Sequence, residues 1–175
     1  MVLLCGLCSI VVYQNWERSH PRSRLEVLNP GNRVGIVAVE TLQGTQTQIE
    51  WTRAGTPTIV YVFSPDCQWC RRNHNAERTV VEGTTGRYRF IGLSLTKDGL
   101  NSYISENNIN YPVYIVPRGA PALKQLGIRG TPETIIISNR GIVQKVWAGA
   151  YAYNDTTRRE IEGLLAIKIA PVNRD

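Results

Sequence analysis

The chain has 175 residues, 42% of them hydrophobic, which is ordinary for one globular domain with an apolar core. Its formal net charge is +6, but the basic residues are dispersed and form no stretch interleaved with aromatic residues. We therefore expect one domain that does not bind nucleic acid.

An apolar segment opens the chain. Residues 1–13 are apolar apart from Ser9, and a largely polar stretch with two prolines follows at 14–32. We interpret 1–13 as a membrane anchor or a signal remnant and 14–32 as a linker. Because the apolar run is shorter than the roughly 20 residues that span a bilayer, we expect the printed chain to lack part of this element.

Cys5 and Cys8 lie within the apolar segment. No strand or helix signal brackets them, so we interpret them as small apolar residues of a membrane-associated segment. Basic residues follow the segment, which by the positive-inside rule favours a cytoplasmic domain. An incomplete anchor weakens that argument, so these residues alone leave the side of the membrane open.

Strands are predicted at the start of the folded domain. Residues 36–42 and 47–51 predict a β-hairpin around a turn at 43–45. Residues 58–63 are apolar at nearly every position, which is typical of a strand buried on both faces of a parallel or mixed sheet. Residues 64–66, Ser-Pro-Asp, end this strand.

Two cysteines, Cys67 and Cys70, follow the buried strand and open a helix predicted over 68–81. At this spacing they share a helix face and can form a disulfide with little backbone movement. Cys67 would lie at the helix N-terminus, where free amides and the helix dipole favour the thiolate and lower the thiol pKa below roughly 8.5. Cys70 would be more covered and suited to resolving a mixed disulfide. The pattern predicts a redox dithiol.

Two other interpretations of this pair stay open. Zinc requires four ligands, and His74 is the nearest further candidate because Cys5 and Cys8 lie in the apolar segment. The pair could also be chemically inert. We expect neither a metal nor an organic cofactor.

The rest of the chain alternates strands and helices. We predict strands at 88–95 and 111–116, helices at 97–107, 121–126 and 156–169, and a hairpin of strands 133–138 and 142–147. The order predicts an α/β fold in which a central mixed β-sheet is flanked by helices and carries an N-terminal β-hairpin extension. Residues 171–175 form a tail.

Two stretches together carry a family resemblance: Val-Phe-Ser-Pro-Asp-Cys-Gln-Trp-Cys at 62–70 and Leu-Gly-Ile-Arg-Gly-Thr-Pro-Glu-Thr at 126–134. With the element order, they resemble the thioredoxin fold. More narrowly they resemble the membrane-anchored thiol-disulfide oxidoreductases of the TlpA/ResA type, which belong with the AhpC/TSA-like redoxins. The resemblance covers 33–170, which we assign as the thioredoxin-like domain.

The resemblance implies an active site. Cys67 and Cys70 would form the redox-active disulfide, and Pro132 would be a cis proline lying against it. The backbone of Thr131 would pair with the substrate, and Gln68 and Trp69, between the cysteines, would also bind it.

The resemblance also implies partners and a location. The substrates would be disulfide-bearing proteins on the extracytoplasmic, periplasmic side of a membrane, reached by an anchored or secreted protein. A membrane thiol-electron donor would recharge the dithiol, and cytochrome c maturation or general disulfide repair would be the pathway.

The chain departs from the family at its usual acid-base positions. Tyr61 replaces a buried Asp of thioredoxin, Asn73 replaces a Glu of some anchored relatives, and Asp66 replaces a common Trp. Asp66 and Glu133 could partly substitute, but we interpret both as solvated surface residues. We likewise expect His74 to be exposed rather than catalytic.

Two rival functions remain. Ser64 three residues before Cys67 is similar to the hydroxyl-x-x-Cys motif of peroxiredoxins, which would imply an antioxidant thiol peroxidase, although Tyr61 stands where a proline is expected. A non-catalytic thioredoxin-like interaction module would need neither Cys67 nor Cys70. The retained dithiol therefore favours an enzyme.

Overall fold

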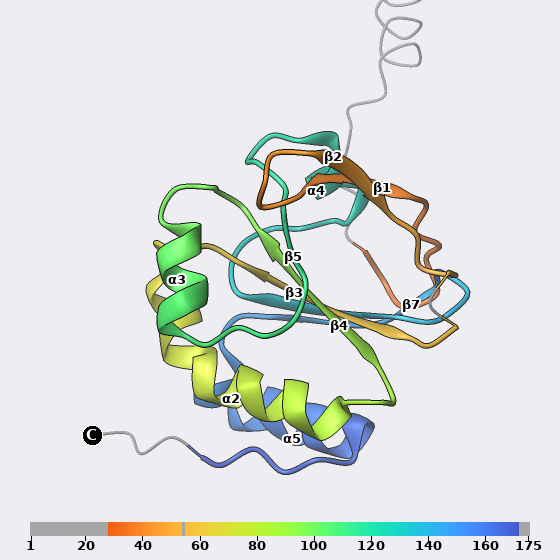
Figure 1. The fold of residues 1–175 in the computed structure, drawn as a ribbon. Coiled ribbons are helices and arrows are strands. Elements are labelled where there is room, and N and C mark those ends of the chain that lie inside the picture. Colours follow the sequence, from red (N-terminus) through yellow and green to blue (C-terminus); the bar gives the residue numbers. More distant parts are fainter. Residues whose placement is uncertain (1–27, 54, 172–175) are drawn as a thin grey trace, which may run out of the picture.

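The computed structural model describes residues 28–171 apart from residue 54 (Figure 1). The predicted anchor at 1–13, most of the linker at 14–32 and all but the first residue of the tail lie outside the described residues. Within the described part, no helix combines the length and apolarity needed to cross a membrane.

Seven strands of the described chain form one mixed sheet in the order β2-β1-β5-β4-β3-β6-β7. The central strand β3 is parallel to β4 and antiparallel to β6, and β1 and β2 form an antiparallel hairpin at one edge. The strands are β1 Val37–Glu40, β2 Gln46–Ile49, β3 Thr58–Phe63, β4 Arg89–Ser94, β5 Val113–Ile115, β6 Glu133–Ile137 and β7 Val143–Ala148. This topology confirms the predicted α/β fold with its N-terminal hairpin.

Helices cover both faces of the sheet. In Figure 1, α2 and α5 lie on one side of the central strands, and the β1–β2 hairpin and α4 lie on the other. The helical elements are α2 Gln68–Thr84, α3 Leu100–Glu106, α4 Pro121–Gln125, the 3-10 helix η1 Tyr151–Tyr153 and α5 Asp155–Leu165.

The strand β3 contributes to two hydrophobic cores because its side chains alternate between the faces of the sheet. Ile59, Tyr61 and Phe63 join the core beneath α2, α3 and α5. Val60 and Val62 join the core beneath the β1–β2 hairpin and α4. Every residue of β3 is buried, as predicted, so the strand that delivers Cys67 is held on both sides.

Two predicted helix ends were wrong. The helix α2 continues through Gly83 to Thr84, and a Cβ at Gly83 would lie 2.7 Å from Cγ2 of Ile167. Gly83 therefore permits close packing of the C-terminal segment rather than ending the helix. The helix α5 ends at Leu165, short of the predicted 169, because Ala166 adopts a left-handed conformation with φ 51°.

Candidate active site

Cys67 is the N-cap residue of α2. The turn 64–66 leads to it from β3, and its backbone amide donates to the Ser64 carbonyl at 3.0 Å. The Cys67 Sγ accepts a hydrogen bond from the Cys70 amide at 3.1 Å. An amide of the first turn of the helix is therefore directed at this sulfur, which is an arrangement that favours a thiolate.

The two cysteines form a disulfide with their Cα atoms 5.2 Å apart. Their surroundings differ, because Cys67 is half-buried whereas Cys70 is fully buried in the core beneath the helices. A protein substrate can therefore reach the Cys67 sulfur in the folded structure, whereas the Cys70 sulfur is covered.

The predicted proline loop lies at the same end of the sheet. The Thr131–Pro132 peptide bond is cis. The β3–β6 register pairs Val62 with Glu133, so Pro132 lies beside the end of β3 from which the chain turns toward Cys67. Thr131 is half-buried and Pro132 is buried. Sheet pairing thus brings together two motifs that are about 60 residues apart.

Trp69 lies between the cysteines and is 48% exposed. Its ring makes an edge contact with Tyr153 from η1, with ring centroids 5.7 Å apart. The Arg72 guanidinium carbon lies 5.2 Å from the Trp69 ring centroid on another side. Gln68 is exposed beside it. The two neighbours hold an aromatic surface in place beside the dithiol.

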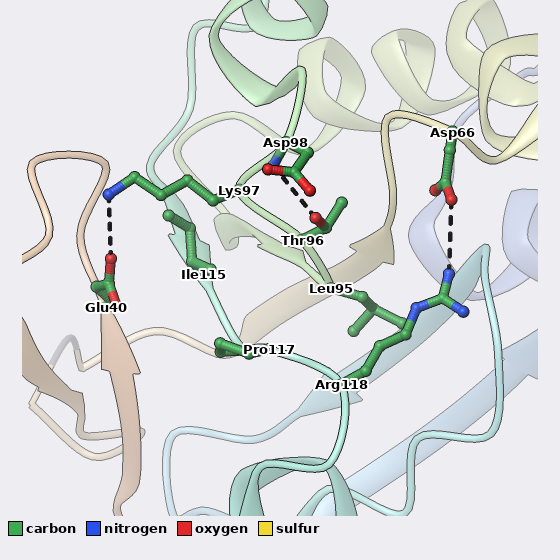
Figure 2. Close-up of a pocket in the computed structure, with 9 residues that line it drawn as sticks. All are labelled: Glu40, Asp66, Leu95, Thr96, Lys97, Asp98, Ile115, Pro117 and Arg118. Atoms are coloured by element: carbon green, nitrogen blue, oxygen red, sulfur yellow. Dashed lines mark hydrogen bonds and ion pairs between the residues drawn. The ribbon is translucent and has the colours of Figure 1, made fainter.

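Asp66 precedes Cys67 and is exposed, as predicted, but it is not free of partners. Its carboxylate accepts a hydrogen bond from Ser64 Oγ, and an oxygen lies 3.8 Å from an Arg118 guanidinium nitrogen (Figure 2). The Ser64 hydrogen bond, and after it the charges of Arg118 and Arg71, lower the pKa of Asp66. The carboxylate beside Cys67 is thus ionised and partly compensated.

A cavity of about 530 Å³ adjoins this ion pair. Figure 2 shows a second pair, Lys97 with Glu40 at 3.5 Å, on the far side of the cavity from Arg118. Buried Leu95 and Ile115 form an apolar part of the lining. The full lining is Glu40, Asp66, Leu95, Thr96, Lys97, Asp98, Ile115, Pro117 and Arg118.

Asn73 links the dithiol helix to two other elements. Its Nδ2 donates to the Tyr61 hydroxyl of β3 at 3.3 Å, and its Oδ1 accepts from the Ala152 amide of η1 at 3.0 Å. Burial raises the pKa of Tyr61 well above its ordinary value, so the phenol stays neutral. Tyr61 and Asn73, two of the positions that depart from the family pattern, therefore contact each other through neutral groups.

A carboxylate missed by the sequence prediction lies deeper along α2. Glu77 is buried, and its Oε2 lies 3.0 Å from Nδ1 of His74. Burial, followed by the charge of Glu77, raises the pKa of Tyr103 to about 12. The prediction that His74 is exposed was wrong, since its side chain is 14% exposed and packs toward Glu77.

Glu133 also differs from its predicted surface role. It is buried, at 2% exposed, where β6 begins between β3 and β7. Its Oε2 accepts a hydrogen bond from the Arg129 amide at 3.1 Å. Burial raises the pKa of Glu133, while hydrogen bonds from the backbone and the charge of Arg129 act in the opposite direction. Strand pairing on both sides encloses the side chain, so Glu133 is not a surface residue.

The buried polar residues had a sequence signal. Cys70, Asn73 and Glu77 are spaced three and four apart, and they share the buried face of α2 with Ala76 and Val80. Polar residues at these positions predict a buried hydrogen-bond network. In the part of the chain that the structure describes, no three His, Cys, Asp or Glu side chains group as potential metal ligands.

The chain was compared with protein-family models, with curated proteins and with solved structures. No family model matches the chain. A protein named "Thioredoxin-like protein" from Haemophilus influenzae is 25% identical over 124 residues, which cover 69% of this chain and 71% of that protein.

Many solved structures resemble this one, among them the following two. A Chlorobium tepidum protein described as a thiol:disulfide interchange protein DsbE has a TM-score of 0.64 and 15% identity, covering 79% of this chain and 97% of that chain. Peroxidoxin BcpB from Mycobacterium tuberculosis has a TM-score of 0.63 and 15% identity, with the same coverage. The chain therefore has the thioredoxin-like fold that was predicted from its two motifs.

Proposed function

We propose that this protein is a thiol-disulfide oxidoreductase that reduces protein disulfides. The observation that carries the proposal is the unequal environment of two bonded cysteines at the start of α2. Cys67 is accessible and receives an amide hydrogen bond at its sulfur, whereas Cys70 is enclosed. This asymmetry suits one attacking and one resolving thiol.

The reaction starts from the reduced dithiol. The Cys67 thiolate attacks one substrate sulfur, the substrate S–S bond breaks, and the leaving sulfur takes up a proton. The Cys70 thiolate then attacks Cys67, the mixed disulfide breaks, and the second substrate sulfur leaves and is protonated. Two electrons pass to the substrate, and the protein ends as the Cys67–Cys70 disulfide. An external dithiol must reduce it again.

The loop at Pro132 and the residues between the cysteines would bind the substrate. Thr131 precedes the first strand pair of β6 and is half-buried, which supports the proposal that its backbone pairs with an extended chain beside Cys67. Gln68 and Trp69 follow Cys67 directly and are exposed. In this proposal Pro132 fills the space next to the disulfide.

We infer an extracytoplasmic location, on the periplasmic side of a membrane. The support is the apolar segment 1–13, which would anchor or export the domain 33–170 through the linker 14–32. Protein disulfides persist in such oxidising compartments. A membrane thiol-electron donor would then supply the electrons, and cytochrome c maturation is one process that would provide substrates.

Substitution of the resolving cysteine tests the proposal. In Cys70→Ser, the hydroxyl cannot displace the substrate, so mixed disulfides with partner proteins should accumulate at Cys67. They should appear on a non-reducing gel of the extracytoplasmic fraction and disappear with DTT. The matched Cys67→Ser protein should trap far fewer. A folded Cys70→Ser protein without Cys67-dependent adducts would refute the disulfide-reductase function.

The peroxidase alternative is disfavoured by one contact. The Ser64 hydroxyl, which the motif comparison would direct to a peroxide beside Cys67, instead donates to Asp66. A peroxidase would form a Cys67 sulfenic acid with hydrogen peroxide and few protein adducts. The same Cys70→Ser protein therefore separates the two activities.

A further inference from the structure

We propose that the surface around Cys67 selects substrates that carry acidic residues next to their disulfide. This inference rests on the proposed disulfide-reductase function. The surface consists of Trp69, Arg71 and Arg72 on the first turns of α2, and we call it the arginine–tryptophan face. The dithiol chemistry alone does not specify this class of substrate.

The position of the face follows from helix spacing. Arg71 is four residues after Cys67, and Arg72 is three residues after Trp69, so each pair lies on adjacent turns of one helix side. All three side chains of the face are exposed. A substrate whose sulfur reaches Cys67 would therefore lie close to this face.

The aromatic part of the face is preorganised. Tyr153 contacts the Trp69 ring from one side and Arg72 lies over it from another, yet Trp69 stays 48% exposed. A side chain held in place before binding loses little conformational entropy when it contacts a partner. Trp69 thus provides apolar contact area without specifying charge.

The charge of the face is positive, and the Asp66 carboxylate on which the Arg71 charge acts is also paired with Arg118. The Arg71 Nη1 donates to the Pro65 carbonyl at 2.7 Å, which holds its guanidinium beside the dithiol turn. Among the described residues, neither Arg71 nor Arg72 forms an ion pair. The nearby carboxylate of Asp66 is engaged by Ser64 and Arg118 (Figure 2).

The adjacent start of α5 does not reverse this charge. Its acidic residue, Asp155, forms an ion pair with Arg158 at 3.0 Å. A substrate segment with Glu or Asp close to its cysteine would therefore meet two exposed guanidinium groups and an aromatic ring. A segment with Lys or Arg would be repelled, which slows its encounter with Cys67.

Three synthetic disulfide peptides test the proposal. They are identical except for the two residues that flank one cysteine, which are Glu, Gln or Lys. The reduced full chain is mixed with each peptide, and the second-order rate of its oxidation is followed. At low salt the Glu peptide should react about five times faster than the Lys peptide, and added salt should reduce this ratio.

Substitutions of single arginines test whether the arginine–tryptophan face causes the difference in rate between the peptides. Arg71→Gln and Arg72→Gln should each lower the Glu-to-Lys ratio. Arg78→Gln removes the same charge from an exposed position further along α2 and should leave the ratio unchanged. Equal rates for the three peptides, or an unchanged ratio in both face variants, would overturn the inference and leave the reductase function standing. Failure to reduce any of the peptides would count against the function itself.

Discussion

At the scale of single residues, the site depends on a few charges around one sulfur. Cys67 has a helix amide at its sulfur and a carboxylate, Asp66, immediately before it. These act in opposite directions, because the amide favours the thiolate and a neighbouring negative charge disfavours it. The ion pair of Asp66 with Arg118 reduces the second effect.

Removal of Arg118 should therefore slow the reaction of Cys67. In the reduced Cys70→Ser protein, Arg118→Gln should lower the rate of Cys67 alkylation by iodoacetamide near neutral pH by about twofold, because the ion pair is exposed. Asp66→Asn should raise the same rate. Equal rates in all three proteins would show that this ion pair does not affect the thiolate.

At the scale of elements, α2 does more than present the dithiol. Its buried face carries Asn73 and Glu77, which connect it to β3, η1 and His74 of its own previous turn. The second oxygen of Glu77, Oε1, is buried and has no hydrogen-bond partner among the described residues. His74 Nδ1 provides a hydrogen bond to this carboxylate, and Tyr111 lies close enough that burial, followed by the charge of Glu77, raises the pKa of its phenol.

Loss of the His74 side chain should destabilise the folded protein. His74→Ala leaves the buried Glu77 without its partner, so the free energy of unfolding should fall by about 2 kcal/mol, measured by urea denaturation. Glu82→Ala, at an exposed position on the same helix, should change it by less than about 0.5 kcal/mol. A His74→Ala protein as stable as wild type would mean that the contact contributes nothing.

At the scale of the whole molecule, antiparallel pairing of β6 with β3 builds one edge of the site and buries Glu133. The raised pKa of Glu133 links global stability to pH. The folded protein holds this proton more tightly than the unfolded chain. Stability is therefore lost as pH rises from the ordinary value of 4.5 through the folded pKa.

Glu133→Gln should remove this loss. Between about pH 4 and pH 7 the wild-type protein should lose stability that the variant keeps. The free energy of unfolding of the variant minus that of wild type should therefore increase over this range. Urea denaturation at both pH values measures the change. A constant difference between the two proteins at the two pH values would show that burial does not shift this carboxyl.

The sequence by itself determined the features that depend on neighbouring residues. The apolar run before Cys67, the turn at 64–66 and the helix after it are contiguous, so local pattern predicted them, and the order of the elements predicted the mixed sheet. Most element positions were predicted within a few residues. The C-terminal ends of α2 and α5 differ from the predicted positions because α2 continues through Gly83 and a left-handed Ala166 ends α5 early.

Only the tertiary structure decided which polar side chains are buried. Glu133 has nothing in its immediate sequence that distinguishes it from a surface carboxylate, and the helical spacing of Glu77 indicates the face it shares with Cys70 but not how fully that face is enclosed. Their burial arises when the dithiol helix packs on β3 and when β6 pairs between β3 and β7. The same packing places Pro132 beside the end of β3. Burial is set by segments that are remote along the chain, so local pattern does not report it.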